Sequence, residues 1–335
     1  MLRAVDVGFG RVKGRSVLKD IEFPSAIGDF KPIRFTNGIE EQKLEDRLCI
    51  EYEGNRYFVG DIAYEQSVPR VTMSGSRFTS QEGLSLMLSA LIILSNNQAE
   101  EVKVVVGLPV NDYAGLENDY KSALERKHYI QLIRPDGSNG DFYSFNIDEV
   151  KILPQPMGTI FNKVLSEHGE FTDINLASGR IAVLDIGKHT VDLALTDKMH
   201  FIDNKSTSFN DIGIFDAYKD LSLELKALGY DIAPDSLDPY ITSGKDLKGL
   251  SGMKERVFKN QADKVISRVV NTWSDLWSFD KILITGGGSL LLGSYIANSI
   301  DSDKVEICNN PTMTNCSGYF KFGKKVWSEC LSPSV

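Results

Sequence analysis

The apolar and polar positions of this chain change period several times, from strand-like runs to helical spacing and back. Alternating or continuous apolar runs predict strands at residues 2–7, 11–18, 19–23, 47–52 and 56–59. A helix is expected at 81–96, followed by a strand at 102–106 whose β-branched residues suit burial on both faces. A helix at 113–126 and strands at 129–133 and 142–153 complete the first half.

The second half of the chain repeats this plan. After a helix at 157–168, three strands are expected at 181–185, 190–196 and 199–205. Helices follow at 212–228 and 253–277, then a strand at 281–285 and a helix at 290–300. The helix at 253–277 has an apolar stripe at Val257, Val265, Ile266, Val269, Val270 and Trp273. The repeated order of strands, helix, strand and helix predicts an α/β protein with two duplicated domains and a cleft between them.

Each half contains the tripeptide Asp-X-Gly between two predicted strands. Asp6-Val7-Gly8 ends the run at 2–7, and Asp185-Ile186-Gly187 ends the run at 181–185. Such tripeptides also mark ordinary turns. Here both have the same context, a β-hairpin with the aspartate at its tip. Glycine lets a bound anion approach the backbone, and aspartate can hold a divalent cation. The pair therefore suggests two similar half-sites for one metal-bound nucleotide.

Polar residues near each tip extend these half-sites. Lys13 lies on the strand that returns from Asp6, so the hairpin can bring its ammonium to the same phosphates, where it neutralises charge. Gly10 adds backbone freedom to this turn. In the second hairpin, Thr190 offers a hydroxyl or an amide to phosphate. Asp192 is either a partner of the site residues or a solvated strand acid.

The tip of the second hairpin and a later glycine turn offer further candidates. Lys188 and His189 are cationic or polar groups suited to phosphate, but exposed turn residues of this kind are also commonly solvated. Three glycines, Gly286, Gly287 and Gly288, follow the predicted strand at 281–285. They can supply a surface for the rest of the nucleotide.

Gln155 lies between the halves in the segment Leu153-Pro154-Gln155-Pro156. The two prolines restrict the backbone just before a predicted helix. An amide held in this way can orient a water for in-line attack on a terminal phosphate. Glutamine is a weak proton acceptor, so slow hydrolysis is expected. The alternative is a polar residue at a helix N-terminus without a chemical role.

Composition narrows the class of protein. The chain has 335 residues, of which 42% are hydrophobic and 25% charged, as in globular proteins with room for two cores. The longest apolar stretch, 84–94, is interrupted by serines and is too short to span a bilayer. No signal segment is recognised at the start, and a cytoplasmic location is expected. No membrane partner is expected either.

Net charge and cysteine content argue against direct binding of nucleic acid and against a cysteine metal site. The net charge of −9 argues against a surface that grips nucleic acid directly, so a connection to DNA would run through an adaptor. The four cysteines show no metal-ligand spacing and are expected to be reduced structural thiols; they are Cys49, Cys308, Cys316 and Cys330.

Taken together, the motifs resemble those of the actin and sugar-kinase ATPase superfamily, with RNase H-like domains. Asp6-Val7-Gly8 with Lys13 resembles its first phosphate loop, 185–192 its second, and 282–288 its adenosine motif. Gln155-Pro156 falls where the family carries the residue that handles the hydrolytic water. In having a lysine seven residues after the first aspartate, the chain resembles actin and the plasmid-segregation actins of the ParM/StbA type. Three stretches also resemble that branch: Val106-Gly107-Leu108-Pro109, Arg77-Phe78-Thr79-Ser80 and residues 314–323.

This resemblance implies a filament-forming ATPase that segregates plasmid DNA. Subunits would assemble head to tail with ATP and Mg²⁺ bound, GTP being possible as well, and hydrolysis would destabilise the polymer. A DNA-binding adaptor of the ParR type would link filament to plasmid. Asp6 and Asp185 would hold the metal through water, with catalysis assigned to Gln155 and these two aspartates. The first actin-like domain would span 1–160 and be joined by a C-terminal helix at 311–335. The second would span 161–310.

Two departures from the family pattern and two rival functions remain open. Many relatives have glutamate where this chain has Gln155, and Lys188 replaces a small residue after the second Asp-X-Gly. One rival is a small-molecule kinase for a sugar or carboxylate, which usually needs a carboxylate base. The other is a cell-shape or cell-division scaffold, which often carries a membrane-binding amphipathic helix.

Overall fold

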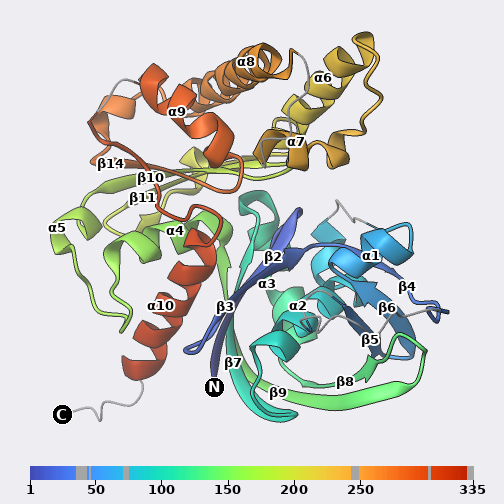
Figure 1. Ribbon diagram of the computed structural model, residues 1–335. Helices are drawn as coiled ribbons and strands as arrows, with labels where there is room; N and C mark the ends of the chain where they lie inside the picture. Colours follow the sequence, from blue (N-terminus) through green and yellow to red (C-terminus); the bar gives the residue numbers. More distant parts are fainter. Residues whose placement is uncertain (35–43, 45–46, 71–74, 243–248, 301–302, 330–335) are drawn as a thin grey trace, which may run out of the picture. The chain divides into compact units, whose positions relative to one another are not determined.

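The computed structural model describes residues 1–34, 44, 47–70, 75–242, 249–300 and 303–329. The chain forms two compact units, drawn in Figure 1. Unit 1 comprises Met1–Thr172 and Asn315–Val335, and unit 2 comprises Asp173–Thr314. The C-terminal segment thus returns to the unit that contains the N-terminus.

Unit 1 is built on a mixed sheet. In the described part of the chain this sheet has nine strands in the order β3-β2-β1-β7-β9-β8-β5-β6-β4. The central strands β1, β7 and β9 are parallel, and the other neighbours are antiparallel. The strand bounds are β1 (Leu2–Val7), β2 (Arg11–Arg15), β3 (Asp20–Pro24), β4 (Ile27–Asp29), β5 (Leu48–Tyr52), β6 (Asn55–Val59), β7 (Ala99–Leu108), β8 (Lys127–Ile133) and β9 (Asn139–Pro154).

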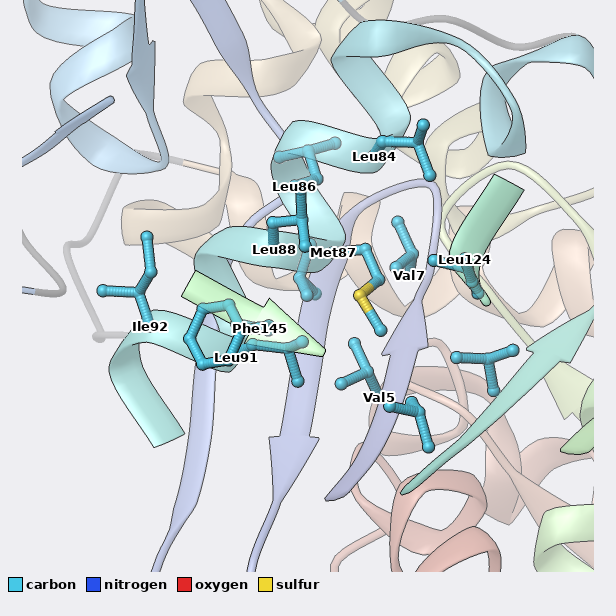
Figure 2. Close-up of a cluster of buried hydrophobic side chains, with 14 of the residues drawn as sticks. Val5, Val7, Leu84, Leu86, Met87, Leu88, Leu91, Ile92, Leu124 and Phe145 are labelled. Carbon is cyan, nitrogen blue, oxygen red and sulfur yellow. The ribbon is translucent and has the colours of Figure 1, made fainter. Parts of the chain in front are cut away.

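The helices of unit 1 lie against this sheet. They are α1 (Asp61–Gln66), the 3₁₀ turn η2 (Gly75–Phe78), α2 (Gln81–Leu94), α3 (Val110–Leu124), α4 (Gln155–Val164) and α10 (Thr314–Glu329), the last from Asn315 onward. Because side chains alternate along a strand, β1 sends Val5 and Val7 to one face and Ala4 to the other. Figure 2 shows α2 packed on the face of Val5 and Val7.

Helix α2 is the centre of the core of unit 1. Its N-cap, Ser80, accepts a hydrogen bond from the Gly83 amide, which satisfies one of the free amides of the first turn. From Gly83 to Leu94 every residue is buried. The sequence therefore predicted this buried helix correctly, apart from an end two residues earlier than expected.

Helices α4 and α10 cover the opposite face of the sheet. The Cys316 thiol lies 3.5 Å from the Ala4 carbonyl oxygen, which places α10 on β1. The two helices approach closely, because a methyl group on Gly318 would overlap with the Gly158 backbone. Beside this crossing, the Thr159 hydroxyl donates to Asn315 Oδ1 at 2.7 Å. The contact fixes the start of α4, where Gln155 lies.

Unit 2 repeats the sheet-and-helix plan on a smaller scale. Its described strands run β12-β11-β10-β14-β15, with β13 also paired to β11. The strands are β10 (Arg180–Ile186), β11 (Val191–Asp197), β12 (His200–Phe201), β13 (Thr207–Phe209), β14 (Lys281–Thr285) and β15 (Val305–Ile307). The helices are α5 (Ile174–Ala177), α6 (Ile214–Ala227), α7 (Asp238–Thr242), α8 (Leu250–Thr272) and α9 (Ser289–Ile300), with 3₁₀ turns η3 (Asp203–Lys205), η4 (Pro234–Ser236) and η5 (Leu276–Ser278).

The core of unit 2 lies between its sheet and three helices. Helix α8 packs against both α6 and α9, which are seen with it in Figure 1. Inward residues of β10, β11 and β14 meet the apolar stripe of α8, including Val265 and Val269. The expected fold class, an α/β protein with two sheet-based domains, is confirmed.

Three sequence predictions in unit 2 are wrong in detail. The strand expected at 199–205 is only the short β12, followed by η3 and β13, because Lys198 and Met199 have positive φ and the next polar residues form a turn. The helix expected at 253–277 ends at Thr272, where Trp273 leaves the helical conformation. Val270, predicted to lie on the apolar stripe, is 50% exposed.

Candidate functional site

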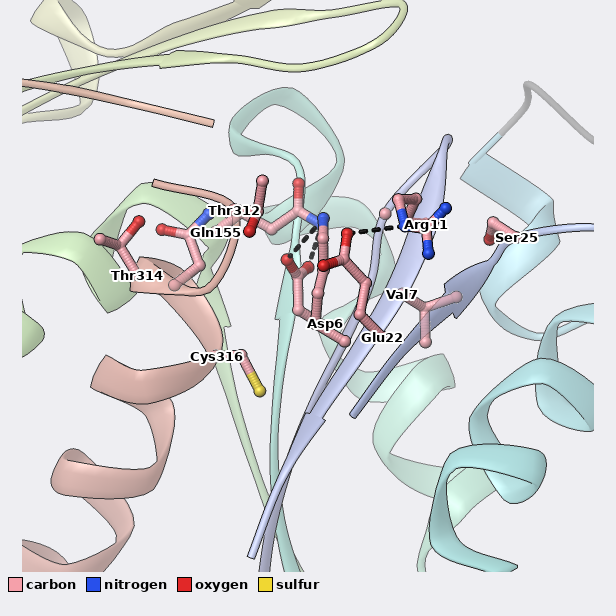
Figure 3. A network of polar contacts seen from close by, with 12 residues as sticks. Asp6, Val7, Arg11, Glu22, Ser25, Gln155, Thr312, Thr314 and Cys316 are labelled. Carbon is pink, nitrogen blue, oxygen red and sulfur yellow. Dashed lines mark hydrogen bonds and ion pairs between the residues drawn. The ribbon is translucent and has the colours of Figure 1, made fainter. Parts of the chain in front are cut away.

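The first Asp-X-Gly is the tip of a hairpin, as the sequence predicted. Strands β1 and β2 are antiparallel, and Asp6 lies directly opposite Lys13. The Lys13 Nζ is 3.7 Å from Asp6 Oδ2, and Gln155 Nε2 donates to Asp6 Oδ1 at 3.1 Å. Figure 3 shows Gln155 beside Asp6. The structure thus brings an acid, a cation and an amide, predicted separately, to one place.

Gln155 is held from several sides. It is the first residue of α4, directly after β9, and Pro156 occupies the second helical position, where no amide donor is needed. The Tyr319 hydroxyl donates to the Gln155 carbonyl at 3.1 Å. Gly107 lies close to both, and a Cβ there would be 2.9 Å from Gln155 Cγ. Tyr319 therefore holds the backbone of Gln155, and Gly107 leaves room for its side chain.

The backbone after Asp6 is supported from behind by Arg77, which sequence reasoning noted only as part of a resembling segment. The guanidinium donates to the carbonyl oxygens of Val7 at 3.3 Å and Gly8 at 2.9 Å. Burial lowers the pKa of Arg77 to about 10, so it remains a cation at neutral pH. The Gly10 carbonyl accepts from the Ser25 amide at 3.0 Å. Both glycines of this turn therefore accept hydrogen bonds through their carbonyl oxygens.

The second Asp-X-Gly is also a hairpin tip. Asp185 lies opposite Asp192 in the pairing of β10 and β11, and both are buried. Asp192 accepts hydrogen bonds from the hydroxyls of Thr190 and Ser208. Asp192 is therefore a buried partner of the site residues and not a solvated strand acid. The Gly187 amide donates to the Thr190 carbonyl at 2.8 Å and closes the turn.

The polar tip residues of this hairpin have partners within unit 2. The Lys188 ammonium lies 2.7 Å from Asp235 Oδ1 and 5.3 Å from the centre of the Phe215 ring. His189 packs edge-on against the same ring at 4.8 Å. Burial, followed by the charge of Lys188, lowers the pKa of His189. The predicted phosphate contact of Lys188 would require it to leave Asp235.

The carbonyls of this tip are bound by the N-terminus of α6. The Ile214 amide donates to the Gly187 carbonyl at 3.1 Å, and the Phe215 amide donates to the Lys188 carbonyl at 2.8 Å. These amides have no partner inside their own helix, so the tip satisfies them. On the other side, Gln261 of α8 donates to the Gly213 carbonyl at 3.0 Å. Helix α8 thereby braces the support of the second hairpin.

The glycine turn follows β14 and lies beside the second hairpin. Gly286 has φ of +83°, a conformation that L side chains rarely adopt, and a Cβ there would overlap with the Asp185 carboxylate. The Gly288 amide donates to the Ile186 carbonyl at 2.8 Å. Helix α9 begins directly afterwards, at Ser289. Gly286 and Gly288 thus lie against the second Asp-X-Gly, and Gly287 lies between them.

Two negative observations concern metals and membranes. Among the residues that the structure describes, no cluster of three or more His, Cys, Asp or Glu side chains has the arrangement of a metal site. A cation at Asp6 or Asp185 would therefore need water or phosphate for most of its ligands. In the described ranges, no helix has both the length and the apolar character needed to cross a bilayer.

The predicted reduced state of the cysteines is consistent with what the described residues show. Cys49, Cys308 and Cys316 are free thiols. Burial raises the pKa of Cys49 to about 12, as expected for an unreactive thiol. Cys330 lies outside the described residues.

Family models match both halves of the chain. A model of actin-like protein N-terminal domains matches residues 4–158. A model of the C-terminal domain of archaeal MreB-like actin homologues matches residues 183–298. The chain belongs to the actin-like superfamily. A comparison with curated protein sequences finds no match.

Solved structures of other actin-like proteins share the fold over nearly the whole chain. The apo psk41 ParM protein is 21% identical, with 99% of each chain covered and a TM-score of 0.75. A ParM from a 15-stranded filament of Clostridium botulinum is 22% identical, with 97% of this chain and 99% of that chain covered and a TM-score of 0.79. The archaeal actin homologue Ta0583 in complex with ADP is 21% identical, with the same coverage and a TM-score of 0.78. At these identities the likeness establishes the fold.

Proposed function

We propose that this actin-like protein binds a nucleoside triphosphate with Mg²⁺ and assembles into filaments in a nucleotide-dependent way. The observation that carries the proposal is the buried Asp6 carboxylate, which meets both the Lys13 ammonium and the Gln155 amide at the tip of an Asp-X-Gly hairpin. A structural protein has little reason to bury Asp6 and Gln155 beside a half-buried Lys13, since each polar group costs desolvation.

Each group in the first hairpin has a role in this proposal. Lys13 neutralises phosphate charge, and Gly8 and Gly10 let the phosphates approach the backbone. The Gln155 Nε2 donates to Asp6, which leaves Oε1 as the atom that orients the attacking water. An amide positions water without accepting its proton strongly, so slow hydrolysis is expected. Asp6 contacts the metal through water.

The second hairpin has the corresponding roles. Asp185 contacts the metal through water, and Gly187 and Thr190 contact phosphate. Asp185 lies opposite the buried Asp192, which accepts hydrogen bonds from Thr190 and Ser208. Lys188 reaches phosphate after releasing Asp235.

The glycine turn takes the nucleoside end of the ligand. A Cβ at Gly286 or Gly288 would overlap with Asp185 or Ile186, whereas one at Gly287 would meet only Thr312, at 3.9 Å. The sugar or base would therefore approach the turn at Gly287. ATP is the proposed nucleotide, with GTP as the alternative.

The wider role rests on the relatives. One ParM is described as a 15-stranded filament, and Ta0583 is described in complex with ADP. We extend both properties to this chain, with head-to-tail self-assembly, plasmid segregation in the cytoplasm and a DNA-binding adaptor of the ParR type. We further identify the two units with the two actin-like domains expected at 1–160 with the C-terminal helix and at 161–310, and place the boundary after α4, at Thr172.

Light scattering and electron microscopy with ATP, with GTP and without nucleotide test the proposal. Filaments that form only with Mg²⁺ and a triphosphate support it. An Asp185→Asn variant should neither bind Mg²⁺-triphosphate tightly nor assemble, whereas Asp197→Asn, at the far end of the neighbouring strand β11, should behave as wild type.

Other outcomes favour the rival functions. A protein that stays monodisperse with every nucleotide but transfers phosphate to a small molecule is a kinase. One that sediments with lipid vesicles is a membrane-bound scaffold. Absence of nucleotide binding by the wild-type protein refutes the proposal altogether.

A further inference from the structure

Arg77 is a buried cation directly behind the first hairpin, with 4% of its surface exposed. Its Nη2 lies 2.9 Å from the Gly8 carbonyl oxygen, 3.3 Å from that of Val7 and 3.2 Å from Ser25 Oγ. The guanidinium also stacks 4.6 Å from the centre of the Phe9 ring. Its contacts are therefore concentrated on the turn that follows Asp6.

These contacts determine the direction in which the neighbouring backbone amides point. In a trans peptide, a carbonyl and the amide of the next residue point to opposite sides. Because the Gly8 carbonyl points toward Arg77, the Phe9 amide points away from it. The Val7 carbonyl also points toward Arg77, so the Gly8 amide likewise points away from it.

The side away from Arg77 is the side of the proposed phosphates. Phe78, the neighbour of Arg77, lies in the core cluster with α2 and α3 on one face of the sheet. Asp6 accepts a hydrogen bond from Gln155 of α4, which covers the opposite face. The turned amides therefore point toward the face where Asp6, Lys13 and Gln155 meet.

The second hairpin reaches the same arrangement by other means. The Gly187 carbonyl, which corresponds to that of Gly8, accepts from the Ile214 amide of α6 at 3.1 Å. The Lys188 amide is thereby turned away from α6, as the Phe9 amide is turned away from Arg77. A helix N-terminus supplies the donor in unit 2, and one side chain supplies it in unit 1.

The position of Arg77 is itself fixed by the start of α2. The Ser80 hydroxyl donates to the Arg77 carbonyl at 2.8 Å. Gly83 faces the same carbonyl, and a methyl group at that position would overlap with it. The backbone of Arg77 is thus clamped, and its side chain crosses from there to the hairpin.

We propose that Arg77 is a positioning residue for the triphosphate, because it holds the Gly8 carbonyl so that the Phe9 amide is presented to phosphate oxygens. This inference rests on the proposed nucleotide binding. The buried charge adds to the effect, since a cation behind the turn favours an anion in front of it. Arg77 does not touch the nucleotide itself.

The test measures affinities for nucleoside tri- and monophosphates by competition with a fluorescent nucleotide. Arg77→Gln should weaken triphosphate binding about ten- to hundredfold, the range for a hydrogen bond that involves a charged group. Monophosphate affinity should change less than about twofold, because a monophosphate lacks the terminal phosphates that the turn contacts. Arg77→Lys keeps the charge but not the planar guanidinium geometry and should recover only part of the loss. Arg70→Gln, an exposed arginine paired with Asp29, is the matched control and should bind as wild type.

The outcomes separate this inference from the proposed function. If the wild-type protein binds no triphosphate, the proposed function fails first. If it binds and Arg77→Gln binds equally well, or loses mono- and triphosphate affinity alike, Arg77 has a purely structural role and the inference is overturned. Full recovery in Arg77→Lys also overturns it, because charge alone would then suffice. If Arg77→Gln does not fold, the tri- to monophosphate comparison in Arg77→Lys decides.

Discussion

Replacing Gln155 by glutamate tests the contact at the centre of the first hairpin. Gln155 Nε2 lies 3.1 Å from Asp6 Oδ1, and both residues are buried. A carboxylate at this distance from Asp6 (3.1 Å) is repelled by about 5 kcal/mol at an effective dielectric constant of about 20. Lys13, at 3.7 Å from Asp6, offsets part of this repulsion.

Protonation sets an upper limit on the loss of stability. The carboxyl introduced by Q155E escapes the repulsion by taking up a proton, so folding raises its pKa. The unfolded carboxyl has a pKa of about 4.3, and each pH unit above it adds about 1.36 kcal/mol to the cost of protonation. At pH 7 the uptake of the proton therefore costs about 4 kcal/mol. At pH 5 it costs about 1 kcal/mol. A carboxyl whose pKa is raised by folding destabilises increasingly as pH rises above the unfolded value, so the penalty must shrink toward pH 5.

Urea unfolding of the nucleotide-free protein at the two pH values provides the assay. The chain has three tryptophans, and phenylalanine at Trp273 and Trp277 leaves Trp327 of α10 as a reporter for unit 1. Gln155→Met is the control: it removes the donor at similar size and should cost about 1.5 to 3 kcal/mol at both pH values. A Q155E penalty that is the same at pH 5 and pH 7 would refute the contact between Gln155 and Asp6.

Three further predictions have defined outcomes. Gly318→Ala should destabilise the protein by about 1 to 3 kcal/mol, because the added methyl group overpacks α10 against α4. Gly115→Ala, in open space on α3, should stabilise it by about 0.5 to 1 kcal/mol. Calorimetry that ranks the two variants otherwise would contradict the close crossing of α4 and α10. Burial lowers the pKa of His128, so the stability it contributes is present above about pH 6.5 and is lost as pH falls below that value. In His128→Gln, the melting temperature should therefore fall less steeply as pH is lowered through this range. Asp235→Asn frees Lys188 and should increase triphosphate affinity, while stability changes by at most about 1 kcal/mol; unchanged affinity would leave Lys188 without a role in binding.

Local patterns predicted much of the fold because they depend on neighbours in the sequence. The hairpin that places Lys13 opposite Asp6 follows from two short strands and a glycine turn, and its register needs no distant contact. The buried helix α2 and the strand β7 were equally readable from continuous apolar runs. The pattern failed at 199–205, where polar turn residues interrupt an apparent strand.

Sequence analysis also missed short elements and long-range partners. The strands β4 and β15 have three residues each, which is too few to show a period. Arg77 was noted only within a resembling segment, because nothing local marks an arginine that will be buried. The one available signal was its place just before the Ser80 cap of a fully apolar helix.

The sequence by itself determined the two hairpins, their aspartates and glycines, and the α/β plan, because hydrophobic period and turn residues act over a few positions. Only the tertiary structure decided which distant groups reach these hairpins. It brought Gln155 to Asp6 across 149 positions, turned the Gly8 carbonyl toward Arg77, and paired Lys188 with Asp235. Such contacts depend on how helices pack on the sheets, and many sequences with the same local pattern would place other side chains there.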